Sequence, residues 1–297
     1  MSAPSPADPG TVLRDATQAM RQGRVADAAD LAAAAEARFE ARGDADGRMR
    51  AGNLRGAAAF ETGRVEEAER HFGAALELAH RLNDSLMTAR ASNNLASVAH
   101  LTGRPDAALS LYRTALIAYQ RLGDRRGMAE TSHNLGIAFR QLRQWTDAER
   151  AAEEAVRHAE GTGEAALRGL ALVGLAELHL ELQAWPLAER EIATAQALAA
   201  EGEDPIGVVE ARRLRAHLLL GMAQPVAALA EAMEARTEAR ELGSALLAAE
   251  CGVIAARAAN GSGERELAAL LRGEARDELA RLGAAGLLAR FDEQWGA

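Results

Sequence analysis

Lysine is absent from the 297-residue chain, so all 34 of its basic residues are arginines. They are outnumbered by 43 aspartates and glutamates, which leaves a formal net charge of −9. This is the wrong sign for a protein whose affinity comes from neutralising phosphates, so the sequence argues against a nucleic-acid partner. The absence of lysine also excludes the Gly-x-x-x-x-Gly-Lys-[Ser/Thr] motif of a P-loop.

Cysteine, aromatic residues and long apolar runs are also scarce. The single cysteine, Cys251, can form neither an intramolecular disulfide nor a metal-binding cysteine pair, which suits a reducing cytoplasm. Aromatic residues make up 3% of the chain. No apolar run approaches the roughly 18 positions of a membrane span, and the N-terminus lacks the basic and apolar regions of a signal peptide. We therefore predict a cytoplasmic protein with no membrane partner.

Motifs that carry catalysis or hold metals are missing as well. The seven histidines form no His-Glu-x-x-His or other helical metal pair. The stretch "GSGERE", which begins at Gly261, lacks the third glycine of a dinucleotide-binding motif. The carboxylates are scattered among arginines, as on a solvated helix surface, and no nucleophile, base and orienting group can be recognised. We predict that the protein is not an enzyme and has no catalytic residues, metal site or cofactor.

What the chain does contain is alanine, a strong helix former that fills sheet cores poorly. The alanines recur every forty residues along the chain. One ladder starts at Ala28 and reaches Ala268, a second starts at Ala35, and a third, of alanine or glycine, starts at Ala16. Residues seven positions apart, such as Ala28 and Ala35, lie on one face of a helix and allow a neighbouring helix to approach closely.

Residues typical of turns recur with the same forty-residue period. Gly23, Gly63, Gly103 and Gly263 fall at one turn, where the middle repeats have Arg143, Gln183 and Ala223. The second turn falls at Gly43, Asn83, Gly123, Gly163, Gly243 and Gly283, with Gly202 beside Glu203 in the remaining repeat. Glycine and asparagine supply the left-handed conformation that ends a helix. Each repeat is therefore predicted to consist of two helices and two turns, seven times over.

These features resemble the tetratricopeptide repeat. The residues that carry the resemblance are Asn-Leu-[Gly/Ala] in "NNLA" from Asn93 and "HNLG" from His133, the turns "GRVADA", "GRVEEA" and, more loosely, "GRPDAA", and the Ala35 ladder. The forty-residue period is similar to the longer-helix variety found in kinesin light chains and bacterial regulator domains, the common unit being about 34 residues. The resemblance implies an all-α fold, a right-handed superhelical α-solenoid of about seven antiparallel helix pairs with a concave groove.

The chain is predicted to have three parts. Residues 1–10, which include Pro4, Pro6 and Pro9, are expected to be a disordered N-terminal tail. Residues 11–283 are expected to form the solenoid. Residues 284–297, with Phe291 and Trp295 at helical spacing, are expected to form a C-terminal helix that caps the last repeat.

In the resembling family the first helix of each pair lines the groove, and the third ladder locates the groove positions on each first helix. The candidate peptide-binding residues of repeats two to four are mostly hydrogen-bond donors: Arg50, Asn53, Arg90, Asn93, Asn94, Ser97, His100, His133, Asn134, Ile137 and Arg140. Those of repeats five and six are more apolar: Leu170, Val173, Glu177, Leu180, Arg213 and His217. A partner segment with an acidic part followed by a hydrophobic part would match both.

The same residues also fit a purely structural interpretation. Asn94 and Asn134 resemble the stacked asparagines that hold a peptide backbone in some family members, but they also match the family consensus. The arginines also fit solvated ion pairs with Glu130 or Glu61, and the histidines also fit satisfied groove or core residues.

Two functions therefore stay open. The first is a non-catalytic protein–protein interaction scaffold that binds a peptide or partner segment in the concave groove. The second is a regulatory sensor in which a ligand or peptide changes the shape of the superhelix, which then acts through a partner protein. Self-association through Trp295 and its neighbours is a further alternative.

Overall fold

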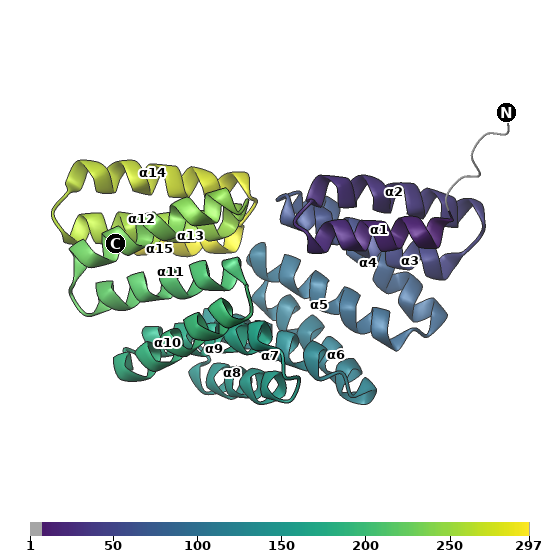
Figure 1. The fold of residues 1–297 in the computed structure, drawn as a ribbon, viewed down its shortest axis with the longest axis horizontal. Helices are drawn as coiled ribbons and strands as arrows, with labels where there is room; N and C mark the ends of the chain where they lie inside the picture. Colours follow the sequence, from purple (N-terminus) through teal and green to yellow (C-terminus); the bar gives the residue numbers. More distant parts are fainter. Residues whose placement is uncertain (1–7, 297) are drawn as a thin grey trace. The chain divides into compact units, whose positions relative to one another are not determined.

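The structure, a computed structural model, describes residues 8–296, and this range contains fifteen α-helices and no strand (Figure 1). The helices pack chiefly against their neighbours in the chain and against the next helix but one. The all-α class and the stacked helix pairs predicted from the sequence are confirmed. No helix in the described range is both long enough and apolar enough to cross a membrane.

The chain divides into two compact units, and each is described by itself. Unit 1 extends to Ala99 and includes Ser110–Leu122, whereas unit 2 consists of His100–Leu109 and the chain from Gly123 onward. Unit 1 holds α1 (Pro9–Arg21), α2 (Val25–Ala41), α3 (Ala45–Glu61), α4 (Val65–Leu82) and most of α5 (Ser85–Leu101) and α6 (Pro105–Leu122). Unit 2 holds α7 (Arg125–Gln141), α8 (Trp145–Glu160), α9 (Ala165–Glu181), α10 (Trp185–Glu201), α11 (Pro205–Gly221), α12 (Pro225–Glu241), α13 (Ala245–Gly261), α14 (Arg265–Arg281) and α15 (Ala285–Gly296).

The forty-residue period is visible in the helix boundaries. The first helices of successive pairs begin at Ala45, Ser85, Arg125, Ala165, Pro205 and Ala245. Helix α15 begins at Ala285, in the same register, so it takes the place of the first helix of a further pair. The alanines of the Ala28 and Ala35 ladders are at most 4% exposed, which confirms that small residues lie where the helices pack most closely.

The left-handed turn positions also follow the predicted pattern. Gly23 has φ 71°, and the same conformation is adopted by Arg143, Gln183 and Ala223 with φ between 57° and 58°. In the remaining repeat it is Glu203, beside Gly202, that has a positive φ of 49°. A side chain strains this conformation, so the middle repeats keep the turn at a cost in stability.

The beginning of α1 differs from the prediction. Residues 1–7 of the expected tail lie outside the described residues, but Pro9 and Gly10 belong to the helix rather than to a tail. The Asp8 carboxylate caps the helix by accepting a hydrogen bond from the Gly10 amide at 3.1 Å. Proline is compatible with the first turn, where an amide hydrogen would have no helical partner.

Candidate functional site: the inner faces of the first helices

An open pocket of about 530 Å³ lies between α1, α3 and α5 of unit 1. Helix α1 contributes Arg14 and Arg21, α3 contributes Arg50, and α5 contributes Arg90. The other lining residues are Gly10, Leu13, Thr17, Gln18, Asn53, Leu54 and Met87. The described lining thus carries four exposed positive charges and no carboxylate, an environment that favours an anionic ligand.

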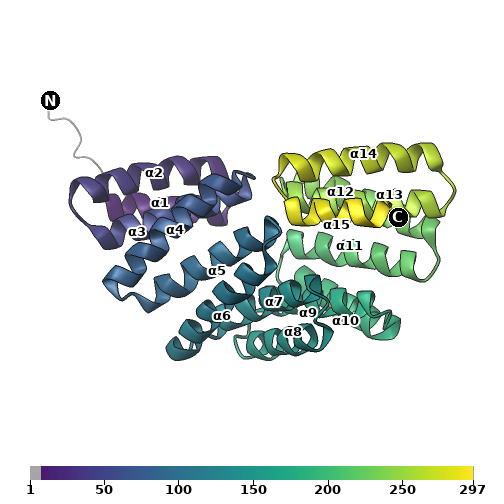
Figure 2. The same cartoon turned by 180° about the vertical axis from the view of Figure 1, so that it is seen from behind.

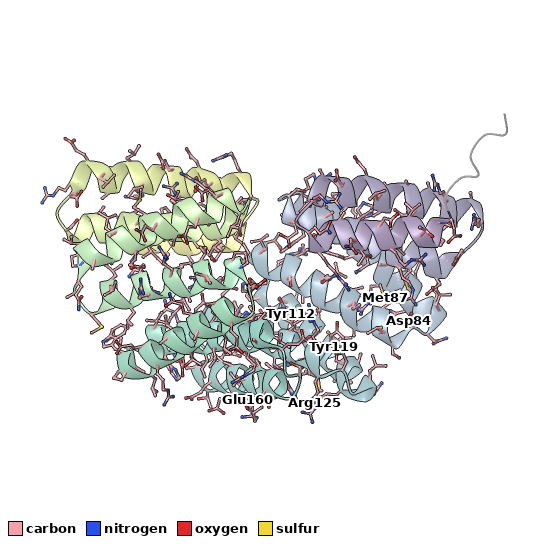
Figure 3. The ribbon with its side chains drawn as sticks, in the orientation of Figure 1. Asp84, Met87, Tyr112, Tyr119, Arg125 and Glu160 are labelled. Carbon is pink, nitrogen blue, oxygen red and sulfur yellow. The ribbon has the colours of Figure 1, made fainter. Side chains whose placement is uncertain are left out.

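Arg50 is oriented by two acidic residues outside the pocket lining. Its Nε lies 3.0 Å from Asp46 Oδ2 and its Nη2 lies 3.4 Å from Asp84 Oδ2. Asp84 also accepts a hydrogen bond from the Met87 amide at 2.9 Å and so caps α5, at the point where Figure 3 labels both residues. Arg50 therefore forms the solvated ion pair of the alternative prediction, but its partners are Asp46 and Asp84 rather than Glu61 or Glu130.

The predicted polar residues of α3 and α5 contact each other. Asn94 Nδ2 donates to Asn53 Oδ1 at 3.2 Å, which links the two first helices by their amide groups. Ser97 Oγ donates to the Asn93 carbonyl and lies 3.2 Å from the hydroxyl of Tyr112, labelled on α6 in Figure 3. Ser97 therefore links α5 to α6 by a side-chain hydrogen bond.

Unit 2 presents a different arrangement, a row of alternating charges on successive first helices. Arg140 Nη2 of α7 lies 2.6 Å from Glu177 Oε2 of α9. The other oxygen of Glu177 lies 2.5 Å from Arg213 Nη2 of α11, and Arg213 Nε lies 3.7 Å from Glu250 Oε2 of α13. The side chains of Arg140 and Arg213 are each 10% exposed. The partners of Arg140 are thus Glu177 and Glu181 rather than the predicted Glu130 or Glu61.

The charge row shifts the pKa of its carboxyl groups in opposite directions. Burial alone would raise the pKa of Glu177, but Arg140 and Arg213 hold it well below its usual range. Burial raises the pKa of Glu250 to about 7, against the opposing effect of Arg213. Burial also raises the pKa of Glu210, which lies 3.3 Å from Arg213 Nη2. Glu177 is therefore the carboxylate that stays ionised between the two arginines.

Three of the predicted histidines lie in unit 2 as neutral groups. Burial lowers the pKa of His100, His133 and His217 to about 4 in each case. His133 is 8% exposed and packs over Gly174, where an added Cβ would lie 2.5 Å from its Nδ1. The Nδ1 atoms of His100 and His133 are buried without a hydrogen-bond partner among the described residues.

The apolar part of the predicted site is largely core. Val173 and Leu180 are 4% and 2% exposed and belong to the cluster that includes Ile192 and Leu214 between α9, α10 and α11. They were predicted to line the groove, and their burial makes them packing residues instead. Leu170 on α9 is exposed, whereas Ile137 and Asn134 on α7 are half-buried.

The prediction missed several residues of these surfaces. Arg14 stands two positions before Ala16 and so aligns with Asn94 and Asn134, a signal that the sequence did contain. Glu210 and Glu250 stand six positions before the third ladder, in the series of Arg50 and Arg90; the sequence placed them on the groove face but not among the binding residues. Arg290 of α15 continues that series and was missed. Glu181, by contrast, had no positional signal.

Comparisons with known proteins agree with the fold. The family model for the tetratricopeptide repeat matches residues 48–116 and 87–161; it describes a repeat and indicates no enzyme family. A search of curated protein sequences finds no match.

Solved structures with the same fold cover nearly the whole chain. The apo form of RapI matches with a TM-score of 0.72 and 13% identity over 92% of this chain and 99% of its own. A Rap protein complexed with Competence and Sporulation Factor matches with a TM-score of 0.64 and 14% identity over 96% of each chain. A tetratricopeptide repeat protein from Parabacteroides merdae matches with a TM-score of 0.57 and 18% identity over 95% of this chain and 100% of its own. Residues 48–161 therefore match the tetratricopeptide repeat, and the chain as a whole has the fold of these tetratricopeptide-repeat structures.

Proposed function

We propose that the chain is a non-catalytic protein–protein interaction scaffold and that it binds an acidic segment of a partner on the inner faces of its first helices. The observation that carries the proposal is the pocket between α1, α3 and α5, with its four arginines and no carboxylate in the described lining. The Rap protein complexed with Competence and Sporulation Factor supports it as a case of the same fold with a bound ligand. The cytoplasmic location predicted from the single cysteine remains part of this proposal.

The pocket suits a carboxylate-bearing segment for three reasons. Arginine can donate two parallel hydrogen bonds to a carboxylate, which makes it a more specific partner than a point charge. The amide of Asn53 lies on the same wall and can bond to a peptide backbone. Leu13 and Leu54 also line the pocket, so an apolar side chain next to the carboxylates would find a contact surface there. The acidic-then-hydrophobic segment predicted from the sequence can therefore be accommodated within unit 1.

The proposal can be tested with two labelled synthetic peptides, Asp-Glu-Asp-Glu-Leu-Ile and its neutral counterpart Asn-Gln-Asn-Gln-Leu-Ile. We expect the chain to bind the acidic peptide more tightly, in a fluorescence anisotropy titration. The double variant Arg50→Ala/Arg90→Ala should weaken that binding about tenfold or more, because it removes two charge-assisted hydrogen-bond donors.

Arg70→Ala is the matched control, because Arg70 is exposed on the second helix α4 and donates only to the Glu66 carbonyl of its own helix among its described contacts. Its affinity for the acidic peptide should equal that of the unmodified chain. Equal binding of the acidic and neutral peptides, or equal losses for the double variant and the control, would contradict the proposal.

A further inference from the structure

Helix α15 contacts parts of unit 2 that are far earlier in the chain. Arg290 Nη2 of α15 lies 3.3 Å from Glu181 Oε1 at the end of α9, 109 residues away. Near the beginning of α15, Gly286 lies against the turn that follows α5: a Cβ added to Gly286 would be 3.1 Å from the Cα and N atoms of Gly103 and from the His100 carbonyl oxygen. A Cβ at this position would be closer to these backbone atoms than an ordinary van der Waals contact, so Gly286 permits an unusually close approach of the two backbones.

The remainder of α15 is fastened to the helices that precede it. Phe291 is buried, and Trp295 packs against the cluster that contains Ile254 of α13. Asp292 accepts two hydrogen bonds from Arg276 at 2.9 and 3.1 Å, and the Arg272 guanidinium lies 5.0 Å from the centre of the Trp295 ring. Figure 2 shows α15 in the foreground, with α14 above it in the view. The helix thus has a fixed part on α13 and α14 and a second contact at α9 and the turn after α5.

The second contact involves the charge row of unit 2. Glu181 Oε1, which pairs with Arg290, also lies 3.8 Å from Arg140 Nε, and Arg140 bonds to Glu177. Arg290 also contributes to the lowered pKa of His100. Arg290 therefore lies beside the end of the row, among residues that the sequence predicted to line a binding groove.

The two ion pairs differ in how easily solvent can replace them. The side chains of Arg290 and Glu181 are 34% and 30% exposed, whereas those of Arg140 and Glu177 are 10% and 14% exposed. An exposed pair exchanges its partners for water or another ion at little cost, but a buried pair does not. Of the two, only the Arg290 pair is suited to open and close.

We propose that the Arg290–Glu181 pair and the Gly286–Gly103 contact form a clasp, and that opening it exposes the inner face of unit 2. An acidic segment of the kind proposed to bind in unit 1 also acts on unit 2, where it opens the clasp by replacing Glu181 as the partner of Arg290. This second part rests on the proposed function, whereas the clasp itself does not. The clasp would supply the shape change required of a ligand-responsive sensor, the alternative function that the sequence left open.

The clasp can be tested without any ligand by hydrogen–deuterium exchange of the full chain. Arg290→Glu places two carboxylates together, and we expect exchange in residues 285–296 and in the turn at 100–104 to become roughly threefold faster or more, as local opening requires. The double variant Glu181→Arg/Arg290→Glu should restore slow exchange. Arg281→Glu makes the same charge change on α14, where Arg281 donates to its own helix, and should leave both segments unchanged.

Gly286→Ala provides a second test that leaves the charges intact. Alanine favours a helix more than glycine does, so faster exchange in residues 285–296 would have to come from the clash with Gly103. Gly273→Ala on α14 is its control, because a Cβ at Gly273 meets nothing within 4 Å. Unchanged exchange in both Arg290→Glu and Gly286→Ala would overturn the clasp.

The ligand step is measured by adding the Asp-Glu-Asp-Glu-Leu-Ile peptide to the unmodified chain. We expect it to accelerate exchange in residues 285–296 as Arg290→Glu does, and the neutral peptide to have no effect. Peptide binding without this acceleration would refute opening by the ligand while the proposed function stands. Acceleration in the two variants but no peptide binding would leave the clasp and refute the proposed function.

Discussion

The helix faces that carry the predicted groove positions use arginine in opposite ways in the two units. In unit 1, Arg50 and Arg90 are exposed and border an open pocket without carboxylates in its described lining. In unit 2, Arg140 and Arg213 are nearly buried and share Glu177. Arg140 and Arg213 are committed to packing because their shared acid, Glu177, is buried with them. Arg50 also has acidic partners, Asp46 and Asp84, but its side chain stays 44% exposed and within reach of a ligand.

The comparison separates a binding surface from a structural one. Two buried guanidinium groups without a counter-charge would carry a large desolvation penalty, so Glu177 is required for the fold of unit 2. The arginines of unit 1 keep their hydration, and their charge can be used by a ligand.

The largest effect is expected for Glu177→Ala. The substitution leaves Arg140 and Arg213 buried without their shared acceptor, and we expect a loss of about 3–5 kcal/mol in the free energy of unfolding. In unit 1, Asp46→Ala removes a partner of Arg50 that is 55% exposed, and we expect a loss of at most about 1 kcal/mol. Urea denaturation of both variants measures the two values. Similar losses would show that the units do not differ in the way described here.

The next largest effect is a loss of folding stability at acidic pH. The folded pKa of His133 is about 4, below the ordinary value of 6.5, so in the range between these values the unfolded chain binds more protons than the folded one. Its neutral form therefore stabilises the fold above pH 6.5, and that stability is lost as the pH falls toward 4. Between pH 7 and 4.5 we expect the unmodified chain to lose about 2 kcal/mol more than His133→Gln does.

The measurement is urea denaturation at a series of pH values. His80→Gln, a change at an exposed histidine of unit 1, is the matched control. If the control flattens the pH dependence as much as His133→Gln does, the acid sensitivity is not a property of the inner face of unit 2.

The fold could be predicted from the sequence because the residues that allow close helix packing recur in every repeat. The ladders of Ala28 and Ala35 specify close packing in seven successive pairs, so a single substitution does not obscure the period. Helix α15 was predicted from the helical spacing of Phe291 and Trp295, and the structure adds that it begins one period after Ala245. The beginning of α1 was missed because it depends on one local bond, from the Gly10 amide to Asp8.

The site was less predictable because the repeat period indicates which residues lie on one face of a helix. It does not indicate which residues of the neighbouring helices contact them. Arg90 and Arg140 were assigned to the same class of donors, yet only Arg140 meets a carboxylate from the next repeat. Val173 and Leu180 had the right period for the inner face, but burial against α10 and α11 removed them from the surface. The contact of Arg290 with Glu181 joins residues 109 positions apart, and no period indicates it.

The smallest expected effect on stability concerns two left-handed turn positions, one in each unit. At the turn between α1 and α2, unit 1 has Gly23 with φ 71°, whereas at the turn between α11 and α12 unit 2 has Ala223 with φ 58°. A Cβ in this conformation crowds the backbone, so Ala223→Gly should raise the free energy of unfolding by about 0.5–1 kcal/mol, after the greater entropy of glycine in the unfolded chain is deducted. Gly23→Ala should lower it by about 1 kcal/mol, and because a Cβ at Gly23 meets no atom within 4 Å, that loss would come from the backbone alone.

Thermal and urea denaturation of the two variants measure these opposite changes. A stabilised Ala223→Gly together with a destabilised Gly23→Ala would show that the turn at Ala223 carries strain that the turn at Gly23 avoids, since the same backbone turn is made at both. No gain for Ala223→Gly would mean that the left-handed turn is relaxed by its neighbours in unit 2. The contrast between the units would then be confined to the charges of their inner faces.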